Sequence, residues 1–166
     1  MRRRTLLIVS VIAGIGLVAG GPAASGAGSA RGTAAVRVVD GDTLAFGGQR
    51  IRLFGIDAPE RDQMCEAEGR SYACGRAASE ALAQLIGGAH VYCHEHSRDP
   101  YGRSVATCTA GGRDLNQAMV AEGWAVAYTR YSRDYVGDEA EARRARRGLW
   151  QGPFERPERY RVEHRR

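Results

Sequence analysis

The chain has 166 residues, 43% of them hydrophobic and 26% charged, which suits one globular domain with a substantial core. A formal net charge of +5 would suggest a nucleic-acid partner, but the excess lies at the two ends. Residues 31–154 carry no net charge, which excludes a long basic stripe as the means of binding an anionic polymer. We therefore expect contacts with phosphate to depend on a few placed arginines.

Residues 1–30 have the layout of a secretory signal peptide followed by a small-residue linker. A positive start, MRRR, precedes the apolar run TLLIVSVIAGIGLVA and then GGPAASGAGSA. The apolar run is shorter than the roughly 20 residues of a membrane span, and an uncleaved N-terminal anchor is the alternative. We expect a secreted or periplasmic protein, free of the membrane after cleavage, with its domain in 31–154 and a basic, flexible tail in 155–166.

Five short strands are expected between turn signals. Apolar alternation and Gly-rich turns place them at residues 34–39, 43–46, 49–56, 89–96 and 104–109. Residues 57–72 read as a long polar loop. Helices are expected over 75–86, after an N-cap at Asp114 as far as Gly123, and over 134–147. This order of elements indicates an α+β fold, for which a five-stranded OB-type barrel is one candidate.

The cysteine count is even, which behind a signal peptide indicates two disulfides in an oxidising compartment. The four residues are Cys65, Cys74, Cys93 and Cys108. They allow three pairings, of which the local one, Cys65–Cys74 with Cys93–Cys108, is favoured. A zinc site with His94 and His96 is the alternative, but the spacings fit no C-x₂₋₄-C pattern.

Four short stretches carry residues suited to chemistry. They are DGDT (40–43), RLFGIDAPE (52–60), DPYGR (99–103) and WAVAY (124–128). Each also has an ordinary structural explanation, because Asp-Gly and Tyr-Gly favour turns and Asp before Ala-Pro favours a helix start. In each stretch, however, an acid or an arginine lies where a strand ends or the chain turns, which is where functional residues are often placed.

Taken together, these residues form a set suited to phosphodiester hydrolysis. Asp42 and Asp57 lie at the ends of strands expected to be neighbours, and hard oxygen ligands of this kind suit Ca²⁺ or Mg²⁺. Arg52 and Arg103 would offset charge on the phosphoryl oxygens, and Glu60 would orient or deprotonate water.

The four stretches, in this order and at these distances, resemble the staphylococcal nuclease (thermonuclease-like) family over about residues 36–150. The resemblance implies a five-stranded OB-type barrel with three helices. It also implies Ca²⁺-dependent endonuclease cleavage of DNA and RNA at the P–O5′ bond, which leaves 3′-phosphate ends. Two departures are the alanine at position 58, where the founding member has threonine, and the four cysteines, which that member lacks.

The resemblance implies a role for each of several residues. One Ca²⁺ ion would be held by the carboxylates of Asp42 and Asp57 and by the backbone carbonyl of Ala58, with Asp40 acting through water. Arg52 and Arg103 would bind the scissile phosphate, and Glu60 would act on the attacking water. Tyr101 and Tyr128 would line the nucleotide pocket.

Three functional hypotheses remain at this level. The first is the Ca²⁺-dependent nuclease, acting as a monomer with DNA or RNA as its partner and without a stable protein partner. The second is a non-catalytic OB-type module that binds nucleic acid or another anionic polymer through the basic tail. The third is an exported scaffold in which the acids hold structural Ca²⁺ only.

Overall fold

The computed structural model describes residues 36–164. The expected signal peptide and linker, and with them the alternative of an N-terminal anchor, lie outside the described residues. Within 36–164, no helix is both long and apolar enough to cross a bilayer.

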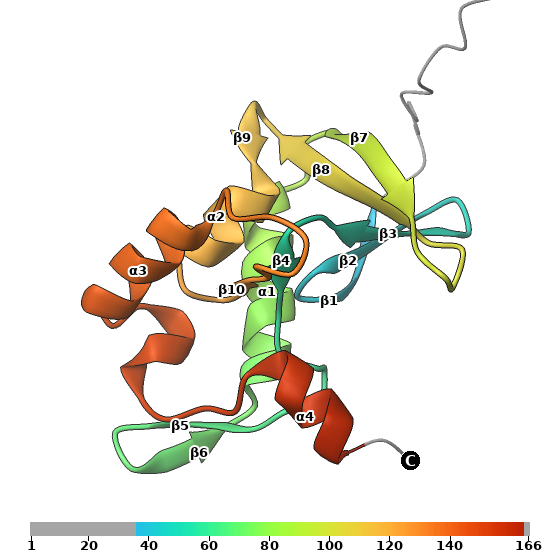
Figure 1. The fold of residues 1–166 in the computed structure, drawn as a ribbon. Coiled ribbons are helices and arrows are strands. Elements are labelled where there is room, and N and C mark those ends of the chain that lie inside the picture. The colour runs from blue at the N-terminus through green and yellow to red at the C-terminus, as the bar shows by residue number, and fades with distance from the viewer. Residues whose placement is uncertain (1–35, 165–166) are drawn as a thin grey trace, which may run out of the picture.

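A mixed sheet curls into a half-barrel and forms the centre of the fold (Figure 1). Its strand order is β1-β2-β3-β8-β7, with β9 added beside β8, and its only parallel pair among the described residues is β3 with β8. The α+β class and the OB-type fold are thus as expected, with a sixth strand in the sheet. The strands are β1 (Arg37–Asp40), β2 (Thr43–Phe46), β3 (Gln49–Leu53), β7 (Val91–Arg98), β8 (Ser104–Ala110) and β9 (Arg113–Asp114).

The strand expected over 49–56 is broken before its end. Gly55 has a φ of +73°, a conformation that favours glycine, and the chain leaves the main sheet there. It continues as β4 (Ile56–Asp57), which pairs with β10 (Val126–Ala127) instead. This break sets Asp57 at the junction between the half-barrel and the helices.

The segment expected to be a loop, 57–72, contains a small hairpin. Its strands are β5 (Cys65–Ala67) and β6 (Arg70–Tyr72), and Glu68 and Gly69 make the turn with positive φ. The disulfide Cys65–Cys74 ties this hairpin to the start of the first helix.

The three expected helices are present, and a fourth follows them. Asp114 is the N-cap of α2, as expected, because its side chain accepts a hydrogen bond from the backbone N–H of Gln117. The fourth helix, α4, lies in the segment expected to be a flexible tail. The bounds are α1 (Cys74–Ile86), α2 (Leu115–Ala121), α3 (Val136–Arg144), the 3₁₀ turn η1 (Gly148–Gln151) and α4 (Pro157–Glu163).

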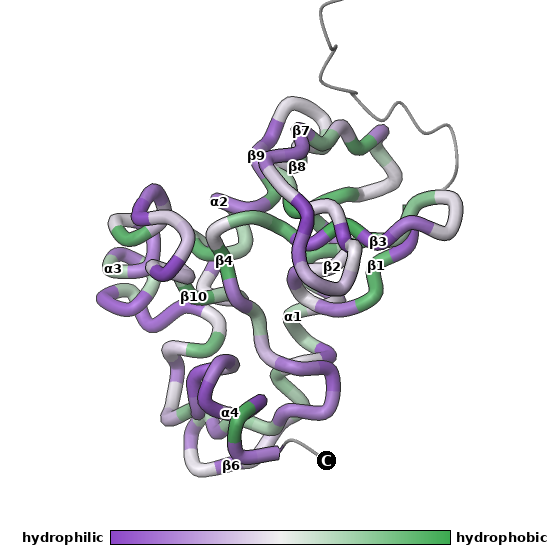
Figure 2. The backbone as a smooth tube through the Cα atoms, turned by 45° about the vertical axis from the view of Figure 1, so that its right-hand side comes forward, coloured by the Kyte–Doolittle hydropathy of each residue, from purple (hydrophilic) through white to green (hydrophobic). Residues whose placement is uncertain are grey.

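Helix α4 forms for local and tertiary reasons. Pro157 is at its first turn, where the missing N–H costs nothing, and Arg159 lies four residues from both Glu155 and Glu163. A helix of seven residues is marginal alone in water, so it depends on docking. Figure 2 shows that α4 is largely hydrophilic, and of its residues only Pro157 is buried.

The expected cysteine pairing is confirmed, with disulfides Cys65–Cys74 and Cys93–Cys108. The second joins residues that lie directly opposite each other on β7 and β8. Because every cysteine is in a disulfide, the zinc alternative loses its thiolates.

We predict that replacing Cys65 and Cys74 together by alanine lowers the free energy of unfolding by about 3 kcal/mol. The reason is that a loop of about ten residues is no longer closed in the unfolded chain. Urea denaturation at fixed pH measures the change, and the double variant of Cys93 and Cys108 should lose a similar amount. A loss below about 1 kcal/mol in the first variant would contradict this loop-closure estimate.

Candidate active site

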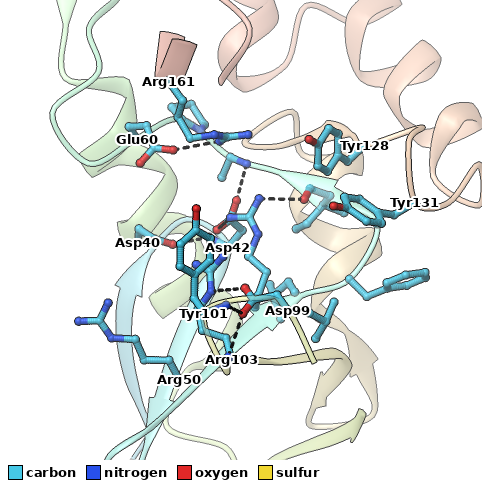
Figure 3. Close-up of a pocket in the computed structure, with 18 of the residues that line it drawn as sticks. Asp40, Asp42, Arg50, Glu60, Asp99, Tyr101, Arg103, Tyr128, Tyr131 and Arg161 are labelled. Carbon is cyan, nitrogen blue, oxygen red and sulfur yellow. Dashed lines mark hydrogen bonds and ion pairs between the residues drawn. The ribbon is translucent and has the colours of Figure 1, made fainter. Parts of the chain in front are cut away.

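A cleft of about 940 Å³ opens between the rim of the half-barrel and helix α4 (Figure 3). Nearly all the residues singled out in the sequence line it, although they come from separate segments. They are Asp40, Asp42, Arg52, Ala58, Glu60, Tyr101, Arg103 and Tyr128. Asp57 does not line the cleft, but it contacts two arginines that do, Arg52 and Arg161.

Asp42, which lines the cleft, and Asp57, which does not, converge on one arginine. Asp42 and Asp57 are 2% and 1% exposed. Arg52 places Nη2 2.7 Å from Oδ1 of Asp57, and its Nη1 forms an ion pair with Oδ1 of Asp42. The register of β2 and β3, which sets Thr43 opposite Arg52, brings these groups together.

The DGD turn fixes the orientation of Asp42. Its backbone N–H donates to Oδ1 of Asp40 at 3.1 Å, and its own Oδ2 accepts the backbone N–H of Ala58 at 2.7 Å. Gly41 allows this close approach, since a Cβ there would lie 2.7 Å from that of Ala58 and 2.8 Å from that of Ala78. The turn therefore does more than reverse the chain, because it presents a buried carboxylate to Ala58, the residue after β4.

Burial shapes the ionisation of Asp42. Loss of hydration raises its pKa to about 6, because the attraction of Arg52 only partly offsets that effect and the neighbouring Asp40 adds to it. Asp42 thus lies in a setting that favours additional positive charge.

Arg103 stands on the opposite wall, at the turn between β7 and β8. Its Nε lies 2.6 Å from Oδ2 of Asp99, and its guanidinium lies 5.6 Å from the centre of the Tyr101 ring. Desolvation by itself raises the pKa of Asp99, but hydrogen bonds from the side chain and backbone of Arg103 outweigh it, so the net change is a lowering. Asp99 holds the arginine toward the cleft, a role the sequence did not reveal.

Glu60 is positioned by the chain that follows β4. Its N–H donates to Oε1 of Gln63, and its backbone carbonyl packs so closely on Gly75 that a Cβ there would lie 1.8 Å from the oxygen. Its carboxylate is partly exposed and accepts a hydrogen bond from Nη1 of Arg161 at 2.9 Å.

Arg161 is the residue that the sequence reasoning missed. It projects from α4 toward Glu60 (Figure 3). Its Nη1 and Nη2 lie 2.9 and 3.0 Å from the two carboxylate oxygens of Asp57. The i, i+4 charges around Arg159 were the available signal for a helix here, but nothing local links Arg161 to a residue a hundred positions earlier.

Tyrosine side chains form two sides of the cleft. Tyr101 is 85% exposed at the rim. Tyr128 is half-buried, and its ring meets that of Tyr131 edge-on with 5.1 Å between centres. Desolvation and the nearby Glu158 raise the pKa of Tyr128, so its hydroxyl stays protonated near neutral pH. Both rings that the sequence singled out face the cleft.

The donor chemistry at the base of the cleft suits a hard cation. Carboxylate oxygens of Asp42 and Asp57, which are ligands that such a cation prefers, both contact the guanidinium group of Arg52, and Arg161 places a second positive charge beside Asp57. Between residues 36 and 164, no three Asp, Glu, His or Cys side chains form a ready metal-binding group. A cation here would therefore share carboxylates that arginines now contact.

A family model and several relatives of this chain have names that refer to nucleases. Residues 50–152 match the family described as Staphylococcal nuclease homologue. The chain is 38% identical over 122 residues to an uncharacterized endonuclease of Escherichia coli O157:H7, covering 69% of this chain and 74% of that protein. It is 36% identical over 135 residues to a protein of Shigella flexneri named micrococcal nuclease, covering 71% and 72%.

A further relative is named for biosynthesis and not for nuclease activity. The chain is 34% identical over 117 residues to the succinoglycan biosynthesis protein ExoI of Rhizobium meliloti (strain 1021). The match covers 68% of this chain but only 61% of that protein.

We predict that Gly75→Ala disrupts the segment that carries Glu60. The added methyl group would collide with the Glu60 carbonyl, which is backbone and cannot move aside without shifting the segment. The matched control is Gly137→Ala in α3, where nothing lies within 4 Å and alanine is the better helix former. Thermal melts should show a loss of at least about 2 kcal/mol for the first variant and none for the control; equal melting temperatures would contradict the packing.

Proposed function

Since this chain belongs to the staphylococcal nuclease family, we propose that it is a Ca²⁺-dependent endonuclease that hydrolyses DNA or RNA at the P–O5′ bond and leaves 3′-phosphate ends. The observation that carries the proposal is the convergence of Asp42 and Asp57 on Arg52 at the base of a cleft that also holds Glu60 and Arg103.

The residues of the cleft divide the work of the proposed reaction. Asp42, Asp57 and the carbonyl of Ala58 would hold one Ca²⁺ ion, with Asp40 acting through water. The ion would supply positive charge to offset that on the phosphoryl oxygens. Arg52 and Arg103 would bind the scissile phosphate through their paired N–H donors.

Glu60 and the tyrosines complete the assignment. Glu60 reaches into the cleft from its own segment and would orient and deprotonate the attacking water. Tyr101 and Tyr128 would contact the nucleotides on either side of the phosphate, since aromatic faces stack on any base.

The two disulfides suggest an oxidising compartment. Together with the signal-peptide pattern of residues 1–30, they support the proposal that the enzyme is secreted or periplasmic, where Ca²⁺ is plentiful. We propose that it acts as a monomer.

Glu60→Gln and Arg103→Ala should each lower kcat/KM on plasmid or denatured DNA by about 10²–10⁴-fold, as is typical for a general base and for a group that stabilises transition-state charge. Arg113→Ala is the matched control, because Arg113 is likewise paired with a carboxylate, Glu122, but does not line the cleft. Digestion with CaCl₂ and with EGTA, followed by end-group analysis, tests the reaction. No cleavage in either condition would refute it, and binding that survives EGTA would favour the non-catalytic module.

Ca²⁺ should raise the melting temperature of the wild-type protein, because a ligand that binds only the folded state stabilises it. Asp57→Asn should lose this shift, whereas Arg103→Ala should keep it while losing cleavage. Differential scanning calorimetry with and without CaCl₂ measures the shift. A Ca²⁺-induced shift without cleavage by the wild-type protein would instead support a purely structural Ca²⁺ site.

A further inference from the structure

Helix α4 places the guanidinium group of Arg161 in contact with the carboxylates of Asp57 and Glu60, which both have roles in the proposed function. Arg161 contacts both oxygens of Asp57 and one oxygen of Glu60, at 2.9 to 3.0 Å. In the proposed reaction, Asp57 is a Ca²⁺ ligand and Glu60 acts on water. Neither carboxylate can give its full charge to those tasks while it accepts hydrogen bonds from Arg161.

Arg161 and a divalent cation would have the same electrostatic role at Asp57. Both are attracted to the same carboxylate oxygens, and two positive groups a few ångströms apart repel each other in a partly buried site. Arg52 already supplies one positive charge there, from the core side. Binding of a cation to Asp57 is thus opposed for as long as Arg161 stays in place.

The weaker burial of Arg161 indicates that a cation at Asp57 would displace Arg161 and not Arg52. Arg52 lies on a central strand with a side chain that is 17% exposed. Arg161 is 32% exposed, and its helix buries only Pro157. Two contacts that Glu158 of α4 makes are polar and long, to Tyr128 at 3.4 Å and to Arg130 at 3.8 Å. Contacts of this type are weak in water, so their loss adds little to the cost of releasing α4.

We propose that Arg161 is a built-in counter-ion that competes with the divalent cation for Asp57 and Glu60, and that cation binding releases α4 from the cleft. The inference rests on the proposed Ca²⁺ site. On this proposal, the C-terminal helix controls the affinity for the cation. The apparent Kd for the ion is raised because only molecules with α4 displaced bind it fully.

Calorimetric titration of the purified protein with CaCl₂ tests the competition. Arg161→Gln should bind Ca²⁺ more tightly than wild type, on the order of tenfold. Arg161→Lys, which keeps the charge but loses the bidentate geometry, should fall between them. The control is Arg159→Gln on the same helix, where the lost charge pairs only with Glu155 and Glu163, and it should leave the Kd unchanged. Thermal melts in EDTA verify that each variant is folded.

Hydrogen–deuterium exchange of the wild-type protein gives a second readout that does not depend on activity. Amides in 157–164 should exchange faster when CaCl₂ is added, because a helix this short does not persist after release. Exchange in α1 should not accelerate. In Arg161→Gln the same amides should exchange fast with or without Ca²⁺.

The outcomes separate this inference from the function on which it rests. Wild-type cleavage with equal Ca²⁺ affinity in wild type and Arg161→Gln would overturn the competition and leave the nuclease standing. Weaker Ca²⁺ binding in Arg161→Gln, or unchanged affinity with a raised KM for DNA, would also overturn it and make Arg161 a supporting or substrate-binding residue. Absence of both Ca²⁺ binding and cleavage in every variant would remove the proposed function and the inference together.

Discussion

The contact on which the site depends is the burial of Asp42 and Asp57 against Arg52. Two ionised carboxylates brought together away from water would repel strongly, and removing one partner of such a group is far more costly than its formation is favourable. The guanidinium offsets this charge, and its placement follows from the β2–β3 register and from the break at Gly55 that redirects β4. The same strand register and chain break that shape the half-barrel therefore also bring the opposite charges of its rim together.

Three arginines of the cleft share a second property, which is that each already contacts at least one carboxylate. Arg52 contacts the two aspartates, Arg103 contacts Asp99, and Arg161 contacts Asp57 and Glu60. Binding of a phosphate and a cation would be an exchange of partners, with internal ion pairs giving way to external ones. Charge would stay balanced before and after the exchange, because the carboxylate partners offset the self-repulsion that clustered arginines would otherwise cause.

Features with local signals could be predicted from the sequence, and features set by long-range contacts could not. The N-cap at Asp114, the disulfide pairing and the gathering of Glu60 and Arg103 in one region follow from spacing, turn chemistry and the family resemblance. The hairpin 65–72 was missed because three-residue strands have no readable alternation. The docking of Arg161 was missed because charge alone does not specify a partner. The catalytic and metal-binding roles stay predictions.

The parallel pairing of β3 with β8 has a consequence for the order in which the sheet can form. These strands are joined through α1 and β7, so the ladder between them closes a long loop and raises the contact order. A chain in which β8 has not yet joined the sheet lacks the strand that connects β7 to β3. Under the proposed export, the sheet would therefore be completed only after nearly all of the chain has crossed the membrane.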